Sequence, residues 1–556
     1  MTIKEIIKKR IFGILKLVRN EDSPSDIQER KMFLNDAERL ARTRIKEYNI
    51  WYEGDGDALL NYYTKGTMID FQIEPIYSRN KRSYFWSISA TESDVKRTHS
   101  GQARNVVDTL VNIVKYPQIQ AGILTEERNA INENLQAILK NCDLKKIYKN
   151  KQVPLTLVEG WGCYKINWDM DVSEYPYPVY YRAEQVDYIK KAGQIVGVIF
   201  RDYYTTEDEK RYMLVETRRT KYVEEEDVKV LIIEKELYRV DESGQYMSKA
   251  EFSEVPELSD VNEYIEIGPT NLLFAVPSIF FEDTSPLGLY GRSIFTGKID
   301  LFDDLDQVLS QSANTVRRST AIEYFNTDFL ERDAKTGMPV QPKAYDRKYI
   351  MYKGGKNAEG GSTGIDPVQV AQPQLNISQY SIEAQAILLQ IINGIMSPAT
   401  LGIDIAKKDN AEAQREKEKV TIFTRNTIIE SEIDILKSLC SQLLCAYEFM
   451  RYGEITKQDY EISVRFSEFA DESFENKLEA LGKAYDNGII SEEMYMRKLY
   501  GDTLTPSERE REMKWLKEHH TDARELGMQG ILGANTPQNE ENPQIEGYEP
   551  NEEEFI

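Results

Sequence analysis

The sequence predicts an α+β protein with several packed regions, and three observations carry that prediction. Helical patterns dominate the first 160 residues, a β-rich stretch runs from Gly162 to about Ile267, and helical patterns return from Asn271. At 556 residues, the chain exceeds what one hydrophobic core usually supports. Its 41% hydrophobic and 29% charged residues are typical of a soluble globular protein.

The N-terminal part contains two helical patterns and a short acidic loop. Residues 1–19 carry an apolar stripe flanked by Lys and Arg, which fits a helix docked on a protein or one lying on a membrane surface. We favour the docked helix. Residues 26–48 continue as a charged helical pattern. In the following segment, WYEGDGD, we interpret Asp55 and Asp57 as loop and cap residues, with Asp57 as the cap, because no third metal ligand lies nearby.

Three more helices are predicted before residue 160. Val106, Leu110 and Val114 stand at helical spacing, and His99 precedes that helix as a structural residue. Two further helices fit residues 125–140 and 143–160. Pro154 should kink the second, because proline lacks an N–H group and crowds the preceding turn.

Strand patterns fill the block from 162 to 267. Runs such as YKINW, IVGVIFRDYYT and KVLIIEKELYRV alternate with turn signals such as KKAGQ and DESGQ, which predicts an antiparallel meander. The block is rich in Tyr, and aromatic rings could stack on single-stranded nucleic acid. Acidic residues are interleaved as often as basic ones, so we interpret the tyrosines as packed sheet faces.

From Asn271 the chain is predicted to return to helix, with one clear helix over 298–319. Leu301, Leu305, Val308, Leu309 and Val316 line one side of it, and its early acidic and late basic residues match the helix dipole. The preceding GRSIFTGKI looks like a phosphate-binding loop. It fails that pattern because five residues separate Gly291 from Gly297 and because Ile299 stands where Ser or Thr would hold magnesium. We therefore predict no ATPase.

Residues 320–375 form an insertion between two helices. The insertion has short strand patterns, AIEYF, KYIMYK and VQVAQ, and a loop, GGKNAEGGSTG, that we interpret as a flexible linker rather than a phosphate-binding loop. A helix, a small β insertion and a second helix predict a stalk that carries a head. Such a stalk needs neighbours to bury its sides.

The second stalk helix and a long later helix frame a loop. Ile382, Ala386, Leu389 and Ile392 share one stripe of the stalk helix, which Ser397 and Pro398 should end. Pro398 and Gly402 interrupt the helix, and Asp409 and Asn410 should cap a new one from Ala411 to about Tyr452. The first turns of this long helix are polar, and an apolar stripe follows (Val420, Phe423, Ile429, Ile433, Leu436, Cys440, Leu443 and Tyr447). A helix of this kind begins in solvent and ends in a core.

The C-terminal part is predicted to contain a strand, a small helical region and a polar tail. Ile462, Val464 and Phe466 alternate in the strand. His519 and His520 sit on a charged helical pattern, and we interpret them as surface residues. From about Gly533 the chain is rich in Pro, Asn and Glu, which predicts disorder or order that depends on a partner.

Charge and cysteine usage narrow the function classes. The net charge of -23 repels nucleic acid, so any DNA contact must be local or weak. The four Cys residues contain no C-x-x-C pair, and with three His residues they favour buried, reduced thiols in an intracellular protein over a metal site. No run is long and apolar enough for a membrane span, and no signal-peptide pattern is present.

The order of these parts resembles the portal proteins of tailed bacteriophages, in particular the type found in long-tailed phages of Gram-positive hosts. The resemblance extends over most of the chain and is carried by WYEGD, SPLGLYGRSIFTGKIDLFDDLDQVLSQSANTVR, GIMSPATLGIDIAKKDNAEAQREKEKVTIFTRN and VRFSEFADES. It implies a wing at 1–297, stem helices at 298–319 and 376–397, and a clip at 320–375. It also implies a tunnel loop at 398–411, a long kinked wing helix at 412–455, a helical crown at 456–532 and a disordered acidic tail at 533–556.

The function that the resemblance implies is that of a conduit. Portal proteins form a ring, usually of twelve subunits, at one capsid vertex, and double-stranded DNA passes through it during packaging and ejection. The implied partners are terminase, the major capsid or scaffolding protein and head–tail connector proteins. The implied location is the virion, with host cytoplasm during assembly, and no enzymatic activity, metal or cofactor is expected.

Residues of the tunnel loop are the candidate site. The resemblance implies that Thr400, Asp404, Lys407, Lys408 and Asn410 line the DNA channel, with the two lysines as local positive charges near passing phosphates. A solvated helix-cap role for both lysines stays open. Two other functions also stay open: another ring-forming head or neck protein, and a DNA-packaging nuclease, which would need a carboxylate cluster.

Overall fold

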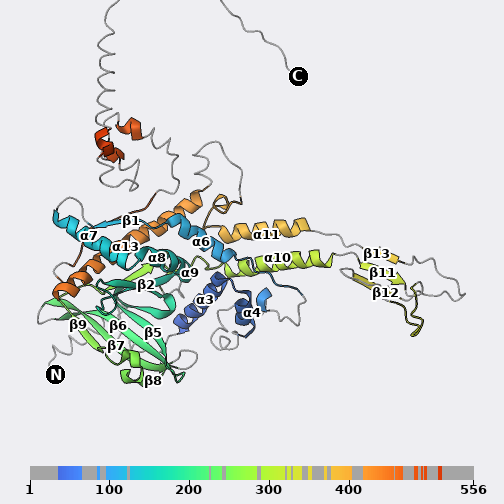
Figure 1. Cartoon of the computed structure of the whole chain (residues 1–556), viewed down its shortest axis with the longest axis horizontal. Coiled ribbons are helices and arrows are strands. Elements are labelled where there is room, and N and C mark those ends of the chain that lie inside the picture. The colour runs from blue at the N-terminus through green and yellow to red at the C-terminus, as the bar shows by residue number, and fades with distance from the viewer. Residues whose placement is uncertain are drawn as a thin grey trace, which may run out of the picture. The chain divides into compact units, whose positions relative to one another are not determined.

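The computed structural model describes residues 36–65, 84–87, 95–121, 126–223, 227–240, 246–284, 290–319, 322–326, 330–340, 348–352, 368–371, 377–403, 418–455, 458–467, 481–485, 490–491, 494–496 and 511–515 (Figure 1). They belong to two compact units, Met1–Ser467 and Glu468–Ile556. Helices and strands are mixed in the first unit, so the predicted α+β class is confirmed. The basic amphipathic segment 1–19 lies outside the described residues.

The first helices follow the predicted order, with one correction at the acidic loop. Helix α3 (Asp36–Glu53) is followed by α4 (Gly56–Lys65), the 3₁₀ turn η2 (Phe85–Ser87) and α6 (Gln102–Val114). The side chain of Asp55, not of Asp57, accepts the N–H of Asp57 at 3.0 Å and caps α4. The helix starts at Gly56, so Asp55 is the residue in cap position and Asp57 already lies in the first turn.

A π-helical turn interrupts the helix that was predicted over 143–160. The chain runs through α7 (Glu126–Asn141), α8 (Leu144–Ile147), the π-helical turn η3 (Tyr148–Gln152) and α9 (Val153–Glu159). Pro154 stands at the start of α9, just after the π turn. The predicted irregularity is therefore confirmed, and it takes the form of a widened turn that accommodates the proline ring.

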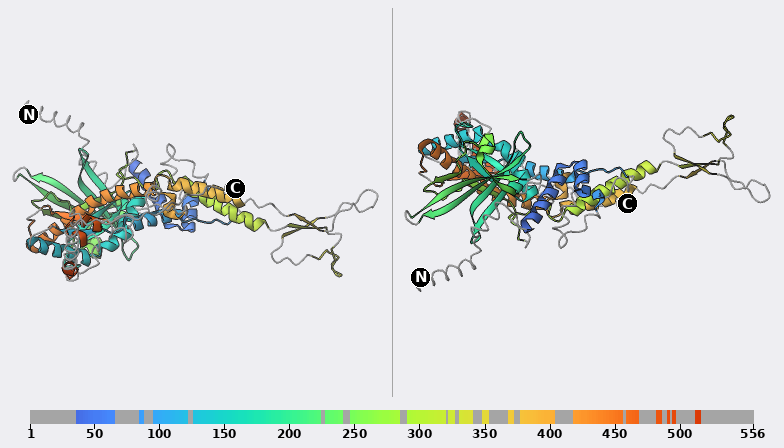
Figure 2. Two further views of the ribbon diagram at one scale, coloured as in Figure 1. Left: turned by 90° about the horizontal axis from the view of Figure 1, so that it is seen from above. Right: turned by 90° about the horizontal axis from the view of Figure 1, so that it is seen from below.

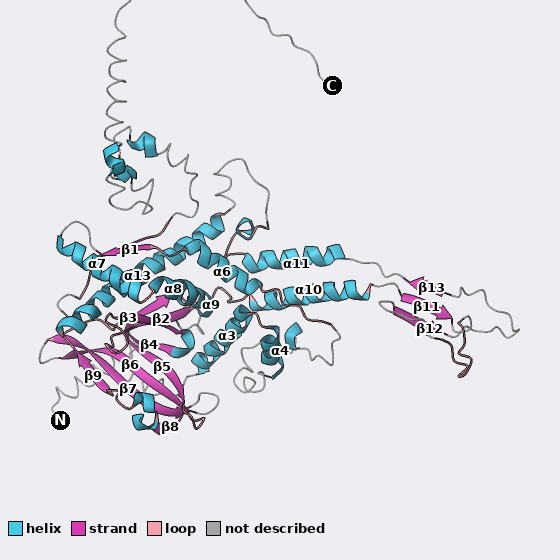
Figure 3. Cartoon of the chain, viewed as in Figure 1, coloured by secondary structure: helices cyan, strands magenta, loops and turns pink. Residues whose placement is uncertain are grey.

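The β-rich block forms two sheets rather than one meander (Figure 3). Strands β4 to β8 are an antiparallel meander, and β9 pairs with β7. YKINW instead lies in β2, the centre of a separate sheet with the order β10-β2-β3. The strand bounds are β2 (Trp161–Asn167), β3 (Tyr177–Arg182), β4 (Val186–Lys191), β5 (Gln194–Thr205), β6 (Arg211–Val223), β7 (Val228–Val240), β8 (Tyr246–Ala250), β9 (Tyr264–Ile267) and β10 (Ala275–Ile279), with 3₁₀ turns η4 (Ala183–Gln185), η5 (Phe252–Glu254) and η6 (Pro256–Leu258).

Most tyrosines of this block are packing residues, as predicted. Tyr164, Tyr188, Tyr212 and Tyr238 are among the largest fully buried side chains. Of the exposed ones, Tyr264 donates its hydroxyl hydrogen to Glu266 at 2.8 Å. A carboxylate beside an exposed ring disfavours stacking on nucleic acid.

Charged residues are buried between the two sheets. Lys165 of β2 lies 2.8 Å from Glu216 of β6, and Arg218 contacts the other oxygen of the same carboxylate at 2.7 Å. Arg218 also donates to the carbonyl oxygens of Ile166 and Phe274, at 2.9 and 2.6 Å. These two cations lower the pKa of Glu216 to about 2 against the opposing effect of burial. The network thus holds β6 against the β10-β2-β3 sheet.

The first stem helix and the small sheet that follows it match the predicted segments closely. Helix α10 (Ile299–Arg318) agrees with the predicted 298–319 within a residue at each end. The three predicted strands form one sheet of β11 (Ile322–Asn326), β12 (Lys348–Tyr352) and β13 (Val368–Ala371), with β11 parallel to β12 and antiparallel to β13. The Gly-rich loop at 354–364 lies outside the described residues.

Helix α11 (Ile377–Ile392) ends earlier than the sequence pattern indicated. The predicted stop at Ser397 and Pro398 is wrong, because α11 ends at Ile392, five residues before Ser397, where Gly394 takes a left-handed conformation with φ 76° and turns the chain. The 3₁₀ turn η7 (Pro398–Leu401) follows. The long helix is described from Lys419 as α13 (Lys419–Tyr452), and 411–417 lie outside the described residues.

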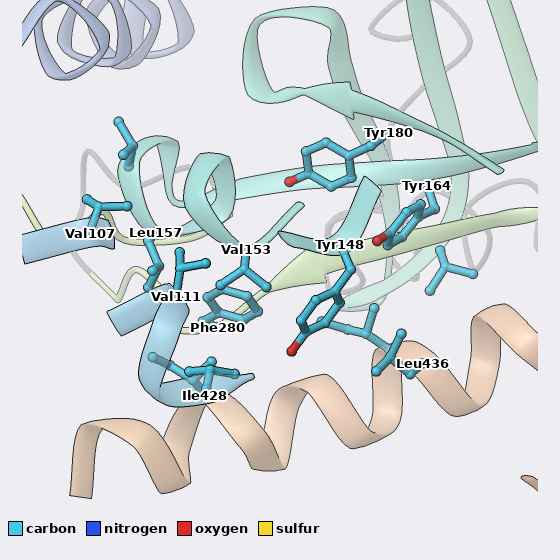
Figure 4. Packing of buried hydrophobic residues seen from close by; sticks show 14 of the residues in the cluster. Val107, Val111, Tyr148, Val153, Leu157, Tyr164, Tyr180, Phe280, Ile428 and Leu436 are labelled. Carbon is cyan, nitrogen blue, oxygen red and sulfur yellow. The ribbon is translucent and has the colours of Figure 1, made fainter. Parts of the chain in front are cut away.

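Helix α13 lies against α6, α7, β2 and β10 in the largest core (Figures 1 and 4). Ile428 and Leu436 of α13 face Tyr148 of the π turn and Phe280, which follows β10. The helix is almost wholly buried from Leu439 to Tyr447, so the prediction that it ends in a core is confirmed, whereas most of the polar first turns that were predicted to lie in solvent fall outside the described residues. At the start, however, the predicted stripe residues Val420 and Phe423 are exposed, and the buried face carries Thr421 and Arg425 instead.

The C-terminal strand belongs to the first unit. Strand β14 (Ile462–Arg465) pairs antiparallel with β1 (Gln118–Ala121), and Ile462 and Val464 are buried as predicted. In the second unit, Tyr495 and Met496 are buried in a small cluster. His519, His520 and the tail from 533 lie outside the described residues.

All four cysteines are free thiols, and three of them are buried while Cys142 is partly buried. Burial raises the pKa of Cys142 to about 11 and that of Cys445 to about 12, so both stay protonated at neutral pH. Among the helices that the structure describes, none combines the length and apolar character that crossing a bilayer requires.

Candidate functional site

The stem is an antiparallel pair of helices, α10 and α11, fastened at both ends (Figure 2). Near the start of α10, the Lys298 ammonium group donates to the carbonyl oxygens of Gln390 and Asn393, at 2.7 and 3.1 Å. Near its end, the Thr315 hydroxyl donates to Tyr380 at 3.3 Å. The stem is therefore a fixed helical hairpin on which the small sheet is inserted.

Lys298 explains why GRSIFTGKI looks like a phosphate loop. Its ammonium group binds the carbonyl oxygens that the end of α11 leaves unpaired, where the helix dipole favours a cation. Gly291, the first glycine of the motif, packs its backbone against Gly160, and a Cβ at either position would clash with the other residue's carbonyl oxygen. The residues of this apparent motif thus have structural partners of their own.

Hydrogen bonds to a single buried threonine hold the start of the candidate loop. The hydroxyl of Thr421, which is fully buried on α13, accepts the N–H of Ser397 at 2.8 Å and lies 2.7 Å from the hydroxyl of Thr400. The N–H of Ile403 donates to the carbonyl oxygen of Pro398, and Gly402 is left-handed with φ 73°. The segment 397–403 is thereby a compact turn anchored on α13.

Of the five predicted channel residues, the structure describes Thr400, and its hydroxyl contacts α13. Asp404, Lys407, Lys408 and Asn410 lie outside the described residues. The residues before and after this segment are held together. Ser397 and Thr400, which precede it, form hydrogen bonds with Thr421, which follows it near the start of α13.

One face of the stem is apolar and exposed. Ile382 is 67% exposed and Leu389 43% exposed, and Ala386 between them on the same stripe is exposed as well. The opposite face of α11, with Ala384 and Ile387, packs on the core cluster. Glu383 is the sole charged residue in the α11 sequence. A helix that is apolar on both faces is normally covered on both.

A shallow pocket lies where this face meets the loop. Leu389, Asn393, Met396, Pro398 and Val420 are among the residues that line it. Phe423, 59% exposed, lies one turn after Val420 on α13. The exposed apolar surface therefore continues from the stem to the start of the long helix.

The opposite side of α10 binds a distant segment through carboxylates, which sequence reasoning missed. Asp306 is fully buried and accepts from Trp86 Nε1 at 3.1 Å, from His99 Nδ1 at 2.7 Å and from the N–H of Ser100 at 2.8 Å. Asp303 accepts the N–H groups of Phe85 and Trp86. Burial raises the pKa of Asp303 to about 7. His99 is thus structural, as predicted, whereas the acidic residues of α10 were explained only by the helix dipole.

No group of three or more His, Cys, Asp or Glu side chains is placed to hold a metal ion within the described ranges. Comparison with protein-family models and with characterised proteins found no family and no individual protein that matches the chain.

Proposed function

We propose that the chain is a portal subunit of a tailed bacteriophage. Copies of it, twelve in the usual arrangement, form a ring at a capsid vertex through which double-stranded DNA passes during packaging and ejection. The ring also docks terminase, the major capsid or scaffolding protein and head–tail connector proteins. The 320–375 insertion is the clip, and 398–411 is the tunnel loop.

The observation that carries this proposal is the exposed apolar stripe of α11. Ile382, Ala386 and Leu389 face away from α10 on a stem that is fastened at both ends. Burying one Ile or Leu side chain is worth about 1.5 to 3 kcal/mol. A neighbouring stem is the cover that suits such a stripe, and repeating a head-to-tail contact closes a ring.

Net charge supports passage of DNA rather than tight binding. Twelve copies at -23 each carry 12 × -23 = -276 formal charges. An acidic ring holds a polyanion weakly, so DNA can slide.

Purified protein is expected to form rings with a bore wide enough for duplex DNA, as checked by negative-stain electron microscopy and native mass spectrometry. A monomer, or a ring with a closed centre, would contradict the proposal. Rings without such a bore favour another head or neck protein. ATP hydrolysis or metal-dependent DNA nicking by the purified protein favours a packaging enzyme.

The double substitution Ile382→Glu and Leu389→Glu is expected to break the ring into monomers. It removes two apolar side chains that the ring would bury and places two charges in each subunit contact. Association between subunits should therefore weaken by at least about 3 kcal/mol, or roughly a hundredfold. Native mass spectrometry measures the distribution. The matched control is Met170→Glu with Val172→Glu, two exposed apolar residues between β2 and β3. This control should form rings like the wild type. Equal loss of rings in both variants would show that the exposed stripe of α11 is not the contact between subunits.

The double substitution Lys407→Ala and Lys408→Ala is expected to reduce retention of packaged DNA, because these side chains are the local positive charges that the tunnel loop offers to phosphates. The measurement is the fraction of virions that keep a full genome at rising salt. Lys149→Ala with Lys151→Ala, two exposed lysines before α9, is the charge-matched control. Unchanged packaging and retention in the tunnel-loop variant would leave the lysines as solvated cap charges.

A further inference from the structure

A chain of polar side chains crosses the core where α13 meets the π-helical turn. Gln152, the last residue of the turn, donates to Glu432 Oε1 at 2.6 Å and to Ser278 Oγ at 3.0 Å. The Thr156 hydroxyl lies 2.9 Å from Ser278 and 2.6 Å from the Tyr180 hydroxyl. Gln152 and Glu432 have no exposed surface, although one carries an amide and the other a carboxyl group.

Within the described part of the protein, four buried oxygens around these polar side chains have no hydrogen-bond partner. They are Gln152 Oε1, Glu432 Oε2 and the hydroxyls of Tyr148 and Tyr164. Figure 4 shows Tyr148 pointing at α13 between Ile428 and Leu436, the part of the helix that carries Glu432. A negative charge on Glu432 would raise the pKa of both Tyr148 and Tyr164, so the three groups are close enough to sense each other. Buried oxygens in such a group normally share an internal water molecule.

Among the side chains that the structure describes, no cation reaches the Glu432 carboxyl group. Arg425, on the same helix, donates to the carbonyl oxygens of Ile113 and Ser467 instead. Within the described ranges, the other titratable side chains that face this region are four tyrosines whose pKa is raised by burial, so that all are neutral at physiological pH: Tyr116 after α6, Tyr148 of the π turn, Tyr164 of β2 and Tyr180 of β3. An ionised carboxylate with no cation beside it is costly to bury, whereas a neutral carboxyl group is a hydrogen-bond donor.

We propose that this cluster is a binding site for internal water and one proton, in which neutral Glu432 donates through Oε2 to water held by Gln152 Oε1, Tyr148 and Tyr164. The π turn makes the site, because it brings Tyr148 and Gln152 against one stretch of α13. The bound proton then keeps α13 packed against the π-helical turn and against strands β2 and β10. The inference concerns the core of one subunit and does not depend on the proposed function.

The test is a comparison of the full-length wild type with Glu432→Gln, which keeps the shape of the neutral acid. Burial raises the pKa of Glu432 to about 8 from its usual 4.5. A raised folded-state pKa gives stability that is complete below about pH 4.5 and is lost as pH rises to about 8. The melting temperature of Glu432→Gln relative to the wild type is therefore expected to increase by about 4 to 8 °C between pH 5 and pH 8. Glu430→Gln, the same change on an exposed position of α13, should show no such trend.

Infrared spectra identify the protonation state directly. The wild-type minus Glu432→Gln spectrum at pH 7 should show the C=O band of a protonated carboxyl group, which disappears above about pH 8. Carboxylate bands at pH 7, or an equal pH trend in both proteins, would overturn the proposal. A wild-type melting temperature that rises with K⁺ or Na⁺ but not with choline, and does so only when Glu432 is present, would also overturn it and assign a cation site.

Tyr148→Phe and Tyr164→Phe test the water. If water is bound, each variant loses one of its partners and melts a few degrees lower than the wild type. If the hydroxyls are truly unsatisfied, their removal raises the melting temperature, and the water part of the proposal fails.

Discussion

Replacing Glu216 by Ala is expected to lower the free energy of unfolding by roughly 3 to 5 kcal/mol, because it leaves two buried cations without their carboxylate. Lys165 and Arg218 both bind Glu216, and all three side chains are at least nine-tenths buried. Without Glu216, Arg218 keeps its hydrogen bonds to the carbonyl oxygens of Ile166 and Phe274. The Lys165 ammonium group keeps a more distant carboxylate, Asp202 at 4.0 Å, and the rings of Tyr181 and Phe200. Urea unfolding followed by circular dichroism measures the loss.

The pH dependence separates this network from ordinary packing. The folded-state pKa of Glu216 is lowered to about 2 from 4.5, so the stability it contributes is present above about pH 4.5 and is lost as pH falls toward 2. Glu216→Gln should lack this loss. Glu234→Ala is the control, because Glu234 pairs with Arg219 at 2.8 Å on the partly exposed side of the sheet and should cost at most about 1 kcal/mol. Equal costs for Glu216→Ala and Glu234→Ala would contradict the buried network.

The stem and the small inserted sheet were predictable because their patterns are local. Helix α10 has an uninterrupted apolar stripe, and β11, β12 and β13 are short runs between turn signals. The end of α11 was misplaced because Ser397 and Pro398 are a stronger stop pattern than Asn393 and Gly394. Strand β10 was missed because Pro277 lies inside it, and proline fits there since β10 is an edge strand of its sheet.

What sequence could not reveal depends on partners far along the chain. Thr421 and Arg425 look like surface residues of a polar helix start, but they face inward and bind Ser397, Thr400 and two backbone carbonyl groups. Glu432 has no pattern that distinguishes it from the exposed Glu430. The apolar residues Val420 and Phe423 turn outward for the same geometric reason, since a helix that buries its polar stripe exposes the one beside it.

Asp306→Ala is expected to lower the free energy of unfolding by roughly 3 to 6 kcal/mol and to release residues 85–87 and 95–100 from α10. The carboxylate accepts three hydrogen bonds, from Trp86, His99 and Ser100, and each buried donor left without an acceptor costs about 1 to 3 kcal/mol. The rings of Trp51 and Trp86 flank His99, with centroids 5.6 and 6.2 Å away, so water has little access to replace the lost acceptor.

Hydrogen exchange measures this release, because the amides at 85–87 and 95–100 should exchange faster in Asp306→Ala while those of α13 keep their protection. Asp304→Ala is the matched control, since Asp304 is the exposed acidic neighbour on the same helix turn and should change stability by less than about 0.5 kcal/mol. Unaltered exchange at 95–100 in Asp306→Ala would mean that aromatic packing alone holds this segment. Faster exchange there with an intact α10 would establish that the Asp306 carboxylate holds residues 85–87 and 95–100 on the stem.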